Sequence, residues 1–170
     1  MKNLSLIPAA KNIALKVHGD QVDKKQYPYM AHILDVASRV AHLGESYEIV
    51  GLLHDAIEDA SPAEFRAEVI AEINVTFDYE VSQAITAMTK SVGEDYFGEY
   101  LPRLRDNKIA LQVKIADASH NLSKAHLIQE IQLQDKLRSK YIKVLNELGA
   151  NGLTLERPVA FKNGQWIEVA

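Results

Sequence analysis

Residues 47–60 read YEIVGLLHDAIEDA, a stretch in which apolar side chains occupy most faces of a predicted helix. A helix that is apolar nearly all round belongs in the middle of a helical bundle. Its second half also carries four ionisable residues, His54, Asp55, Glu58 and Asp59, whose spacing places them on adjoining faces. Burying that much charge is costly unless it is compensated, and a divalent cation is the simplest compensation.

Apolar positions recur at helical spacing along most of the remaining chain. They predict further helices over residues 7–18, 33–43, 63–75, 79–89, 95–105, 108–127 and 131–148. Beyond these, two short apolar runs flank Asn163-Gly164, a two-residue signal that is typical of a β-hairpin. We therefore expect an all-α helical bundle over residues 1–150, with residues 151–170 forming a small C-terminal β-hairpin packed on it.

The composition limits the class of protein. The chain has 170 residues, a net charge of −4 and no cysteine. A metal must therefore be held by His, Asp or Glu, and disulfides and thiol nucleophiles are excluded. The acidic balance is not typical of a nucleic-acid-binding protein, and no run reaches the ~18 apolar residues that span a bilayer. We expect a soluble, cytoplasmic protein without a nucleic-acid or membrane partner, and the sequence leaves its oligomeric state open.

Further ligands for a cation must come from other helices. His32 lies near the start of the preceding predicted helix, and Asp117 lies in an apolar stretch further along the chain. Together with His54 and Asp55, they make a set of two histidines and two aspartates without sulfur. Such a set suits an octahedral metal such as Mn2+ or Fe2+, and Zn2+ is an alternative.

A metal of this kind points to hydrolysis of a phosphate compound. It lowers the pKa of a bound water molecule, and Glu58 and Asp59 are the candidates to accept the proton from that water. Asn121 lies one turn after Asp117 on the same face of its helix. The residues that could bind phosphate or nucleoside groups are Lys24, Lys25, Lys90, Arg103 and Lys114, together with Tyr29, Tyr96 and Tyr100.

Each of these features has an ordinary explanation when it is taken alone. A His-Asp pair is often a cap or a surface feature, and Asp117 could simply pair with Lys114. The histidines that we interpret as structural are His18, His42 and His126, whereas the role of His120 stays open. What favours the metal site is the ordered combination on apolar helices of His32, His54-Asp55, Glu58-Asp59 and Asp117.

At these residues the chain resembles the HD-domain phosphohydrolase superfamily, whose ligand pattern is H…HD…D. It is most similar to the hydrolase domain of the bifunctional alarmone synthetase–hydrolases and to the small alarmone hydrolases. The matching segments are ALKVHGDQVDKK (residues 14–25), YPYMAHILDVA (27–37), GLLHDAIEDA (51–60), Met88-Thr89-Lys90 and VKIADASHNL (113–122), in family order.

The resemblance implies metal ligation by His32, His54, Asp55 and Asp117, and catalytic roles for Glu58 and Asp59. It implies contacts with the nucleotide or its phosphates by Lys24, Lys25, Lys90 and Asn121. Enzymes of this kind remove the 3′-pyrophosphate from guanosine tetra- and pentaphosphate, the alarmones of the stringent response, in a manganese-dependent reaction. We therefore expect a guanosine 3′,5′-bis(diphosphate) 3′-pyrophosphohydrolase with a small-molecule nucleotide substrate.

The chain departs from the family pattern at three places, and these keep alternatives open. Ala118 and Ser119 stand after Asp117, where a basic residue is usual, Ile33 replaces a proline, and Lys24 replaces a common arginine. The missing basic residue favours another HD-type nucleotide phosphohydrolase, such as a nucleoside monophosphate phosphatase. A non-catalytic nucleotide-binding HD protein and a purely structural helical protein are further alternatives. The intact pair of carboxylates after the HD motif argues against a mere binder, which needs no proton acceptor.

Overall fold

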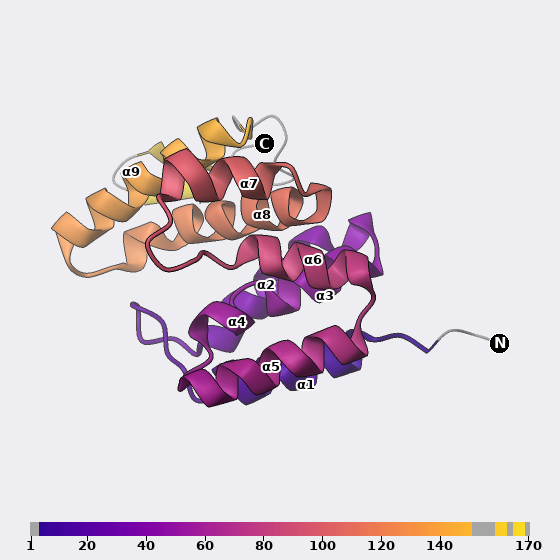
Figure 1. The fold of residues 1–170 in the computed structure, drawn as a ribbon. Helices are drawn as coiled ribbons and strands as arrows, with labels where there is room; N and C mark the ends of the chain where they lie inside the picture. Colours follow the sequence, from indigo (N-terminus) through magenta and orange to yellow (C-terminus); the bar gives the residue numbers. More distant parts are fainter. Residues whose placement is uncertain (1–3, 151–158, 163–164, 169–170) are drawn as a thin grey trace.

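The computed structural model describes residues 4–150, 159–162 and 165–168. Helices dominate it, so the predicted all-α class is confirmed. The α-helices are α1 (Ile7–His18), α2 (Tyr29–Val40), α3 (Glu45–Leu53), α4 (Ala56–Asp59), α5 (Ala63–Thr76), α6 (Tyr79–Met88), α7 (Leu101–Arg105), α8 (Lys108–Lys124) and α9 (Ile131–Glu147) (Figure 1). None of the helices in these described segments is long and apolar enough to cross a membrane.

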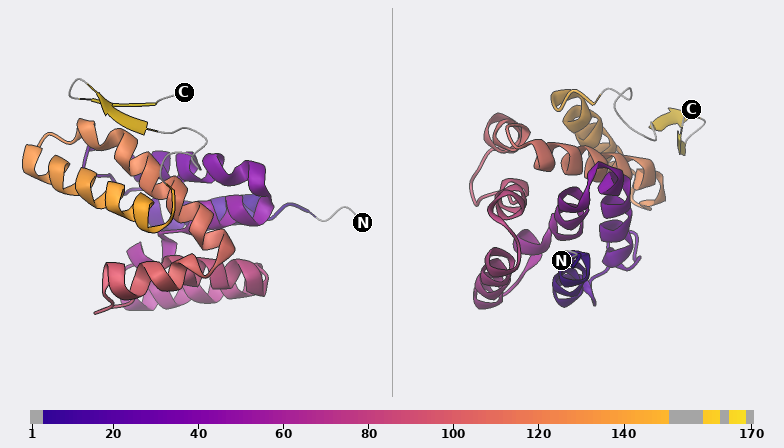
Figure 2. Two further views of the ribbon diagram at one scale, coloured as in Figure 1. Left: turned by 90° about the horizontal axis from the view of Figure 1, so that it is seen from above. Right: turned by 90° about the vertical axis from the view of Figure 1, so that its right-hand side faces the viewer.

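Three helices, α2, α3 and α8, pack against one another at the centre of the bundle. α1 packs on α2 and α3, whereas α6 and α9 pack on α8 (Figures 1 and 2). The residues of the central helices that are completely buried are Ile33, Val36, Val50, Leu52, Leu53, Ala110, Val113 and Ala118. These helices are the frame that holds the buried ionisable residues.

A close approach between α2 and α3 depends on Gly51. A Cβ atom added at Gly51 would lie 2.7 Å from the Cα atom of Ala37 in α2, nearer than packed carbon atoms approach. The absence of a side chain therefore allows the two helix backbones to come together. His32 in α2 and His54, which directly follows α3, both lie within about two turns of this contact.

The helix predicted over residues 47–60 is not continuous, and that prediction is wrong. α3 ends at Leu53, a turn follows at His54 and Asp55, and α4 begins at Ala56. Asp55 has φ −107° and ψ 0°, in the bridge region between helix and strand. Adjacent residues of an unbroken helix point about 100° apart, so they do not face each other. The turn instead brings His54 Nε2 within 3.1 Å of Asp55 Oδ2.

Other helix ends also differ from the prediction. Within the predicted helix over residues 95–105, a π-helical turn (Tyr96–Tyr100) precedes α7. The predicted helices over residues 33–43 and 108–127 each end in a 3₁₀ turn, at Ala41–Leu43 and Ala125–Leu127. α8 begins where the side chain of Asn107 accepts hydrogen bonds from the backbone of the first turn. This helix carries Asp117 into the core.

Two short strands lie near the end of the chain. β1 (Val159–Lys162) pairs antiparallel with β2 (Gln165–Glu168), with Val159 opposite Glu168. The predicted turn residues Asn163-Gly164 lie outside the described residues. Packing of a β-hairpin on the helical bundle therefore stays a prediction, as does the division of the chain at residue 150.

Candidate metal centre and its pocket

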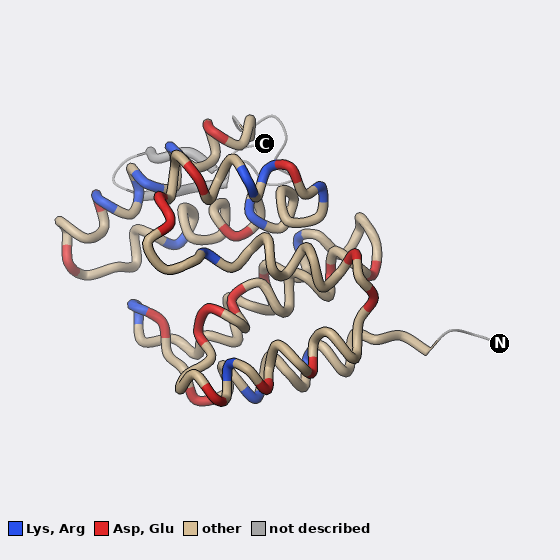
Figure 3. Tube along the Cα trace, viewed as in Figure 1, with Lys and Arg blue, Asp and Glu red and all other residues tan. Residues whose placement is uncertain are grey.

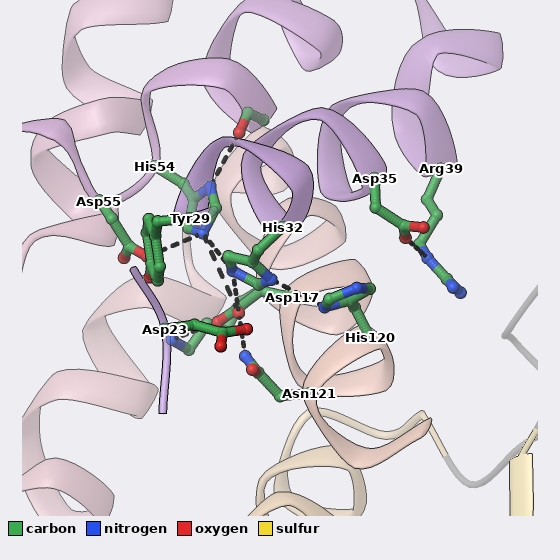
Figure 4. Close-up of polar contacts among 12 residues, drawn as sticks. Asp23, Tyr29, His32, Asp35, Arg39, His54, Asp55, Asp117, His120 and Asn121 are labelled. Carbon is green, nitrogen blue, oxygen red and sulfur yellow. Dashed lines mark hydrogen bonds and ion pairs between the residues drawn. The ribbon is translucent and has the colours of Figure 1, made fainter. Parts of the chain in front are cut away.

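Four predicted ligand residues come together between α2, α3 and α8. His32 Nε2 lies 3.3 Å from His54 Nε2 and 3.3 Å from Asp117 Oδ1 (Figure 4). His54 Nε2 lies 3.1 Å from Asp55 Oδ2 and 4.0 Å from Asp117 Oδ1. His32, His54 and Asp117 are buried, and Asp55 is partly exposed at the edge of the cluster.

The donor atoms of this cluster fit a divalent metal. Ligand atoms held at about 2.1 Å from one ion lie roughly 3 to 4 Å from one another, which is the spacing of the four atom pairs given above. His54 Nδ1 is 2.8 Å from the carbonyl oxygen of Gly51 and donates to it, so its Nε2 atom faces the carboxylates. The Nε2 atom of His32 faces the same point, because its Nδ1 atom is 2.8 Å from His120 Nδ1.

Electrostatics keep both carboxylates of the cluster ionised. Burial disfavours charge on Asp117, but Lys114, with Nζ 2.9 Å from Oδ2, and the nearby histidines hold the pKa of Asp117 well below its usual range. Burial opposes charge on His54 as well, but the carboxylate of Asp55 raises the pKa of His54 to about 9. A proton on His54 therefore balances the carboxylates in the metal-free protein, and a divalent cation can take its place.

Glu58 and Asp59 lie on α4 beside the cluster, and each is held by one hydrogen bond. Gln21 Nε2 donates to Asp59 Oδ2 at 3.0 Å, and the backbone N–H of Lys90 donates to Glu58 Oε2 at 3.1 Å. The buried ring of His18 stands behind Gln21, with Nδ1 2.6 Å from its Oε1 atom. The two carboxylates are exposed, so they are accessible to solvent and to a substrate.

A pocket of about 380 Å³ opens over the cluster. The predicted residues that line it are Asp55, Glu58, Asp59, Lys24, Lys25, Lys90, Lys114, Tyr29, Tyr96, Tyr100, Asp117 and Asn121. Figure 3 shows acidic residues in α4 and basic residues spaced along α9, which also contributes to the pocket wall. The pocket thus combines a carboxylate floor with a lysine-rich rim.

Two of the predicted substrate-binding residues are already engaged. Lys25 Nζ pairs with Asp23 Oδ2 at 2.8 Å, and Asn121 Nδ2 donates to Asp117 Oδ1 at 2.6 Å. Asn121 therefore orients a candidate ligand as well as lining the pocket.

One further expectation needs correction. Arg103 does not line the pocket, because its guanidinium pairs with Glu94 (Nε to Oε1 2.8 Å) and donates to carbonyl groups of α6 and the residue after it. Tyr29 lines the pocket, and its contact with a nucleoside stays a prediction. Its hydroxyl donates to Asp55 Oδ2 at 2.5 Å. Burial raises the pKa of Tyr29, so this hydroxyl keeps its proton and stays a donor.

Several residues at the site carried no clear signal in the sequence. These are Gln21, His120, Lys140 and Tyr141. Lys140 and Tyr141 line the pocket from α9, where Lys140 Nζ lies 4.5 Å from the centre of the Tyr96 ring. The helical pattern of α9 predicts the helix, but it gives no information on which face lies over the pocket.

Comparison with known proteins assigns the family. The HD domain family model matches residues 29–122, which is more than half of the chain and includes the whole cluster of histidines and aspartates. The chain therefore belongs to the HD domain family.

Individual relatives share most of the chain. The GTP pyrophosphokinase of Myxococcus xanthus is 28% identical over 173 residues, which cover 91% of this chain and 22% of the relative. Guanosine-3′,5′-bis(diphosphate) 3′-pyrophosphohydrolase of Aquifex aeolicus is 28% identical over 170 residues, or 94% of this chain and 22% of the relative. The chain thus spans about 22% of the length of these two proteins.

A solved structure shares the fold. It is a metazoan ortholog of SpoT, described as hydrolysing ppGpp, and it superimposes with a TM-score of 0.74 over 92% of both chains at 18% sequence identity.

Proposed function

We propose that this chain is a metal-dependent hydrolase of pyrophosphorylated nucleotides, and specifically a guanosine 3′,5′-bis(diphosphate) 3′-pyrophosphohydrolase. The observation that carries the proposal is the convergence of His32, His54, Asp55 and Asp117 beneath a pocket rimmed by lysines. The relative from Aquifex aeolicus, which bears the name of this activity, supports the choice of substrate.

The metal would be held by the two histidines and two aspartates, with Mn2+ as the proposed ion and Fe2+ or Zn2+ as alternatives. When bound, such an ion supplies Lewis-acid polarisation of the phosphoryl group and lowers the pKa of water. Asn121 and Lys114 hold the two oxygens of Asp117, so the orientation of this ligand is fixed from both sides.

The carboxylates of α4 would do the proton chemistry. Glu58 and Asp59 line the pocket on the same side as Asp55 and are proposed to accept the proton of the attacking water. Gln21 holds Asp59, and the backbone of Lys90 holds Glu58, so both carboxylates are positioned before substrate arrives. Catalytic groups that are already held in place lower the activation barrier more than mobile groups do.

The lysines would bind the phosphate oxygens. Lys24, Lys25 and Lys90 lie on the pocket wall, on segments from both sides of α4 in the sequence. Their positive charges can offset the charge of two diphosphate groups, which the aspartate-rich floor alone would repel. Among the described residues, those that line the pocket lie before residue 142, so we propose that residues 1–150 form the catalytic unit and residues 151–170 an extension of it.

Identification of the products tests the function. The purified chain is incubated with Mn2+ and a panel of nucleotides that includes guanosine 3′,5′-bis(diphosphate) and nucleoside monophosphates. We expect release of pyrophosphate, with GDP left behind. Release of orthophosphate in place of pyrophosphate would reject the proposal.

Substitution of a carboxylate tests the mechanism. Glu58→Gln is expected to lower turnover by about 10²–10⁴-fold, the usual contribution of a general base, while Mn2+ binding is retained. Glu64→Gln is the matched control, because Glu64 is an exposed carboxylate on α5 that does not line the pocket. Unchanged turnover in Glu58→Gln would show that another group accepts the proton.

A second candidate is a nucleoside monophosphate phosphatase. It is favoured by the residues after Asp117, because Ala118 and Ser119 are buried and supply no positive charge to the pocket. The same panel decides between the two, since this enzyme would release orthophosphate from a monophosphate and leave the bis(diphosphate) intact.

A further inference from the structure

His120 lies behind the candidate metal centre and makes an unusual contact with it. Its Nδ1 atom is 2.8 Å from His32 Nδ1, and the two ring centroids are 4.7 Å apart (Figure 4). Both rings are buried. When two imidazole nitrogens lie this close, one must carry a proton and donate it, and the other must accept it with a lone pair.

The requirements of metal ligation determine which of the two rings donates the hydrogen bond. The Nε2 atom of His32 points at Asp117 Oδ1 and His54 Nε2, so it is the atom that would ligate a metal, and ligation requires a lone pair there. The proton of His32 must then sit on Nδ1 and be donated to His120. His120 accepts it on Nδ1 and carries its own proton on Nε2.

The comparison with His54 supports this assignment. His54 presents its Nε2 atom to the same point, and its Nδ1 proton is taken by the carbonyl oxygen of Gly51 at 2.8 Å. A metal-ligating histidine almost always donates its second N–H in this way, because the hydrogen bond fixes both the tautomer and the ring orientation. His32 has no backbone carbonyl in that place and has an imidazole instead.

The location of His120 separates it from the substrate. It does not line the pocket that carries Glu58 and the lysines. Instead, it lines a different cavity of about 280 Å³ on the other side of His32, together with Asp35, Lys124 and Leu127. Its influence on the reaction must therefore pass through His32.

We propose that His120 is a positioning residue that accepts the Nδ1 proton of His32 and thereby sets the affinity of the site for its metal. The inference rests on the metal-binding part of the proposed function and on no particular substrate. Loss of a residue that orients a ligand usually lowers metal affinity by about 10–100-fold. That range is the expected effect here.

Two substitutions of His120 separate its hydrogen bond from its packing. His120→Leu has a similar volume but offers no acceptor, whereas His120→Asn places an amide oxygen near the position of Nδ1. The dissociation constant for Mn2+ is measured on the purified full chain without nucleotide, from the EPR signal of the free ion. We expect His120→Leu to bind Mn2+ about 10–100-fold more weakly and His120→Asn to remain near the wild-type value.

The result that overturns the proposal is equal Mn2+ affinity in His120→Leu and wild-type protein, or an equal loss in both variants. Thermal unfolding of the metal-free variants shows whether each one is folded. If His120→Leu does not fold, the ring tautomers of the wild-type protein loaded with diamagnetic Zn2+ are read from ¹⁵N NMR. Protonation of His32 at Nδ1 and of His120 at Nε2 supports the proposal, and the reverse pattern overturns it.

These measurements are independent of substrate identity. Mn2+ binding that depends on His120, without hydrolysis of any nucleotide in the panel, would reject the proposed function and leave the role of His120 intact. Hydrolysis of the bis(diphosphate) by a His120→Leu variant that binds Mn2+ normally would reject the proposed role of His120 and leave the proposed function intact.

Discussion

At the scale of single residues, two hydrogen bonds define the orientation of the Gln21 amide. Its oxygen accepts from the buried ring of His18, so its nitrogen is left to donate to Asp59. His18 was interpreted as structural from the sequence, and its ring is fully buried. Its contact with Gln21 connects it to the pocket through one side chain.

Gln21→Leu tests whether this amide positions Asp59. Without the donor, Asp59 can leave the orientation that we propose for proton transfer, and we expect roughly a tenfold fall in kcat, about the worth of one charge-assisted hydrogen bond. Mn2+ affinity should not change, since Gln21 contacts none of the four candidate ligands. Gln83→Leu, on the exposed face of α6, is the control. A fall in Mn2+ affinity that matches the fall in kcat would contradict the assignment.

His18 also predicts how stability depends on pH. Burial lowers the pKa of His18 from its usual 6.5, so the unfolded chain takes up the proton more readily than the folded one. The free energy of unfolding should therefore fall as the pH drops below 6.5, by up to about 1.4 kcal/mol per pH unit for this one group. Urea unfolding at a series of pH values measures the slope. His18→Phe should show a smaller slope between pH 7 and 5, and an unchanged slope would assign it to other groups.

At the scale of elements, the contact between α2 and α3 joins the fold to the site. Gly51→Ala would put a methyl group 2.7 Å from the Ala37 backbone, so the helices must separate. We expect a loss of about 1–3 kcal/mol in the free energy of unfolding, typical of overpacking, and weaker Mn2+ binding because His32 and His54 move apart. Chemical denaturation and the Mn2+ EPR titration measure the two effects. Wild-type stability in Gly51→Ala would show that α2 can shift without cost.

The sequence predicts the helices well and their interruptions poorly. Apolar periodicity determines the number and order of the long helices, but it does not reveal the turn at His54 and Asp55. Every residue from 47 to 60 is compatible with a helix, and the turn is stabilised by contacts distant in the chain, such as the hydrogen bond from Tyr29 to Asp55. Tertiary contacts of this kind leave no local pattern.

In the candidate site, too, the sequence predicts some residues and misses others. His32, His54, Asp55 and Asp117 could be selected from the sequence, because metal ligation demands particular residue types on apolar helices. His120, the hydrogen-bond partner of His32, could not be selected from the sequence, since an imidazole that accepts a hydrogen bond has the same sequence pattern as any other buried histidine. The contributions of α9 to the pocket were equally hidden, because they depend on how that helix lies on α8.

At the scale of the whole molecule, metal binding should stabilise the fold. A ligand that binds only the folded chain adds about 2.7 kcal/mol to the free energy of unfolding at 100 times its dissociation constant. We therefore expect Mn2+ to raise the melting temperature in a concentration-dependent way, measured by calorimetry. Asp117→Asn should abolish the increase and Glu64→Gln should retain it. An increase that persists in Asp117→Asn would place the bound ion elsewhere.

Part of the pocket rim is separate in the sequence from the candidate metal ligands. The candidate ligands lie on α2, α8 and the turn after α3, within the stretch that matches the HD family, whereas Lys24 and Tyr141 approach from either side of it in the sequence. Substitutions in those flanking segments can change which nucleotide fits while the centre stays intact. A lineage could thus acquire new substrates by altering these flanking segments, which are also where an engineer would place a library intended to change the substrate.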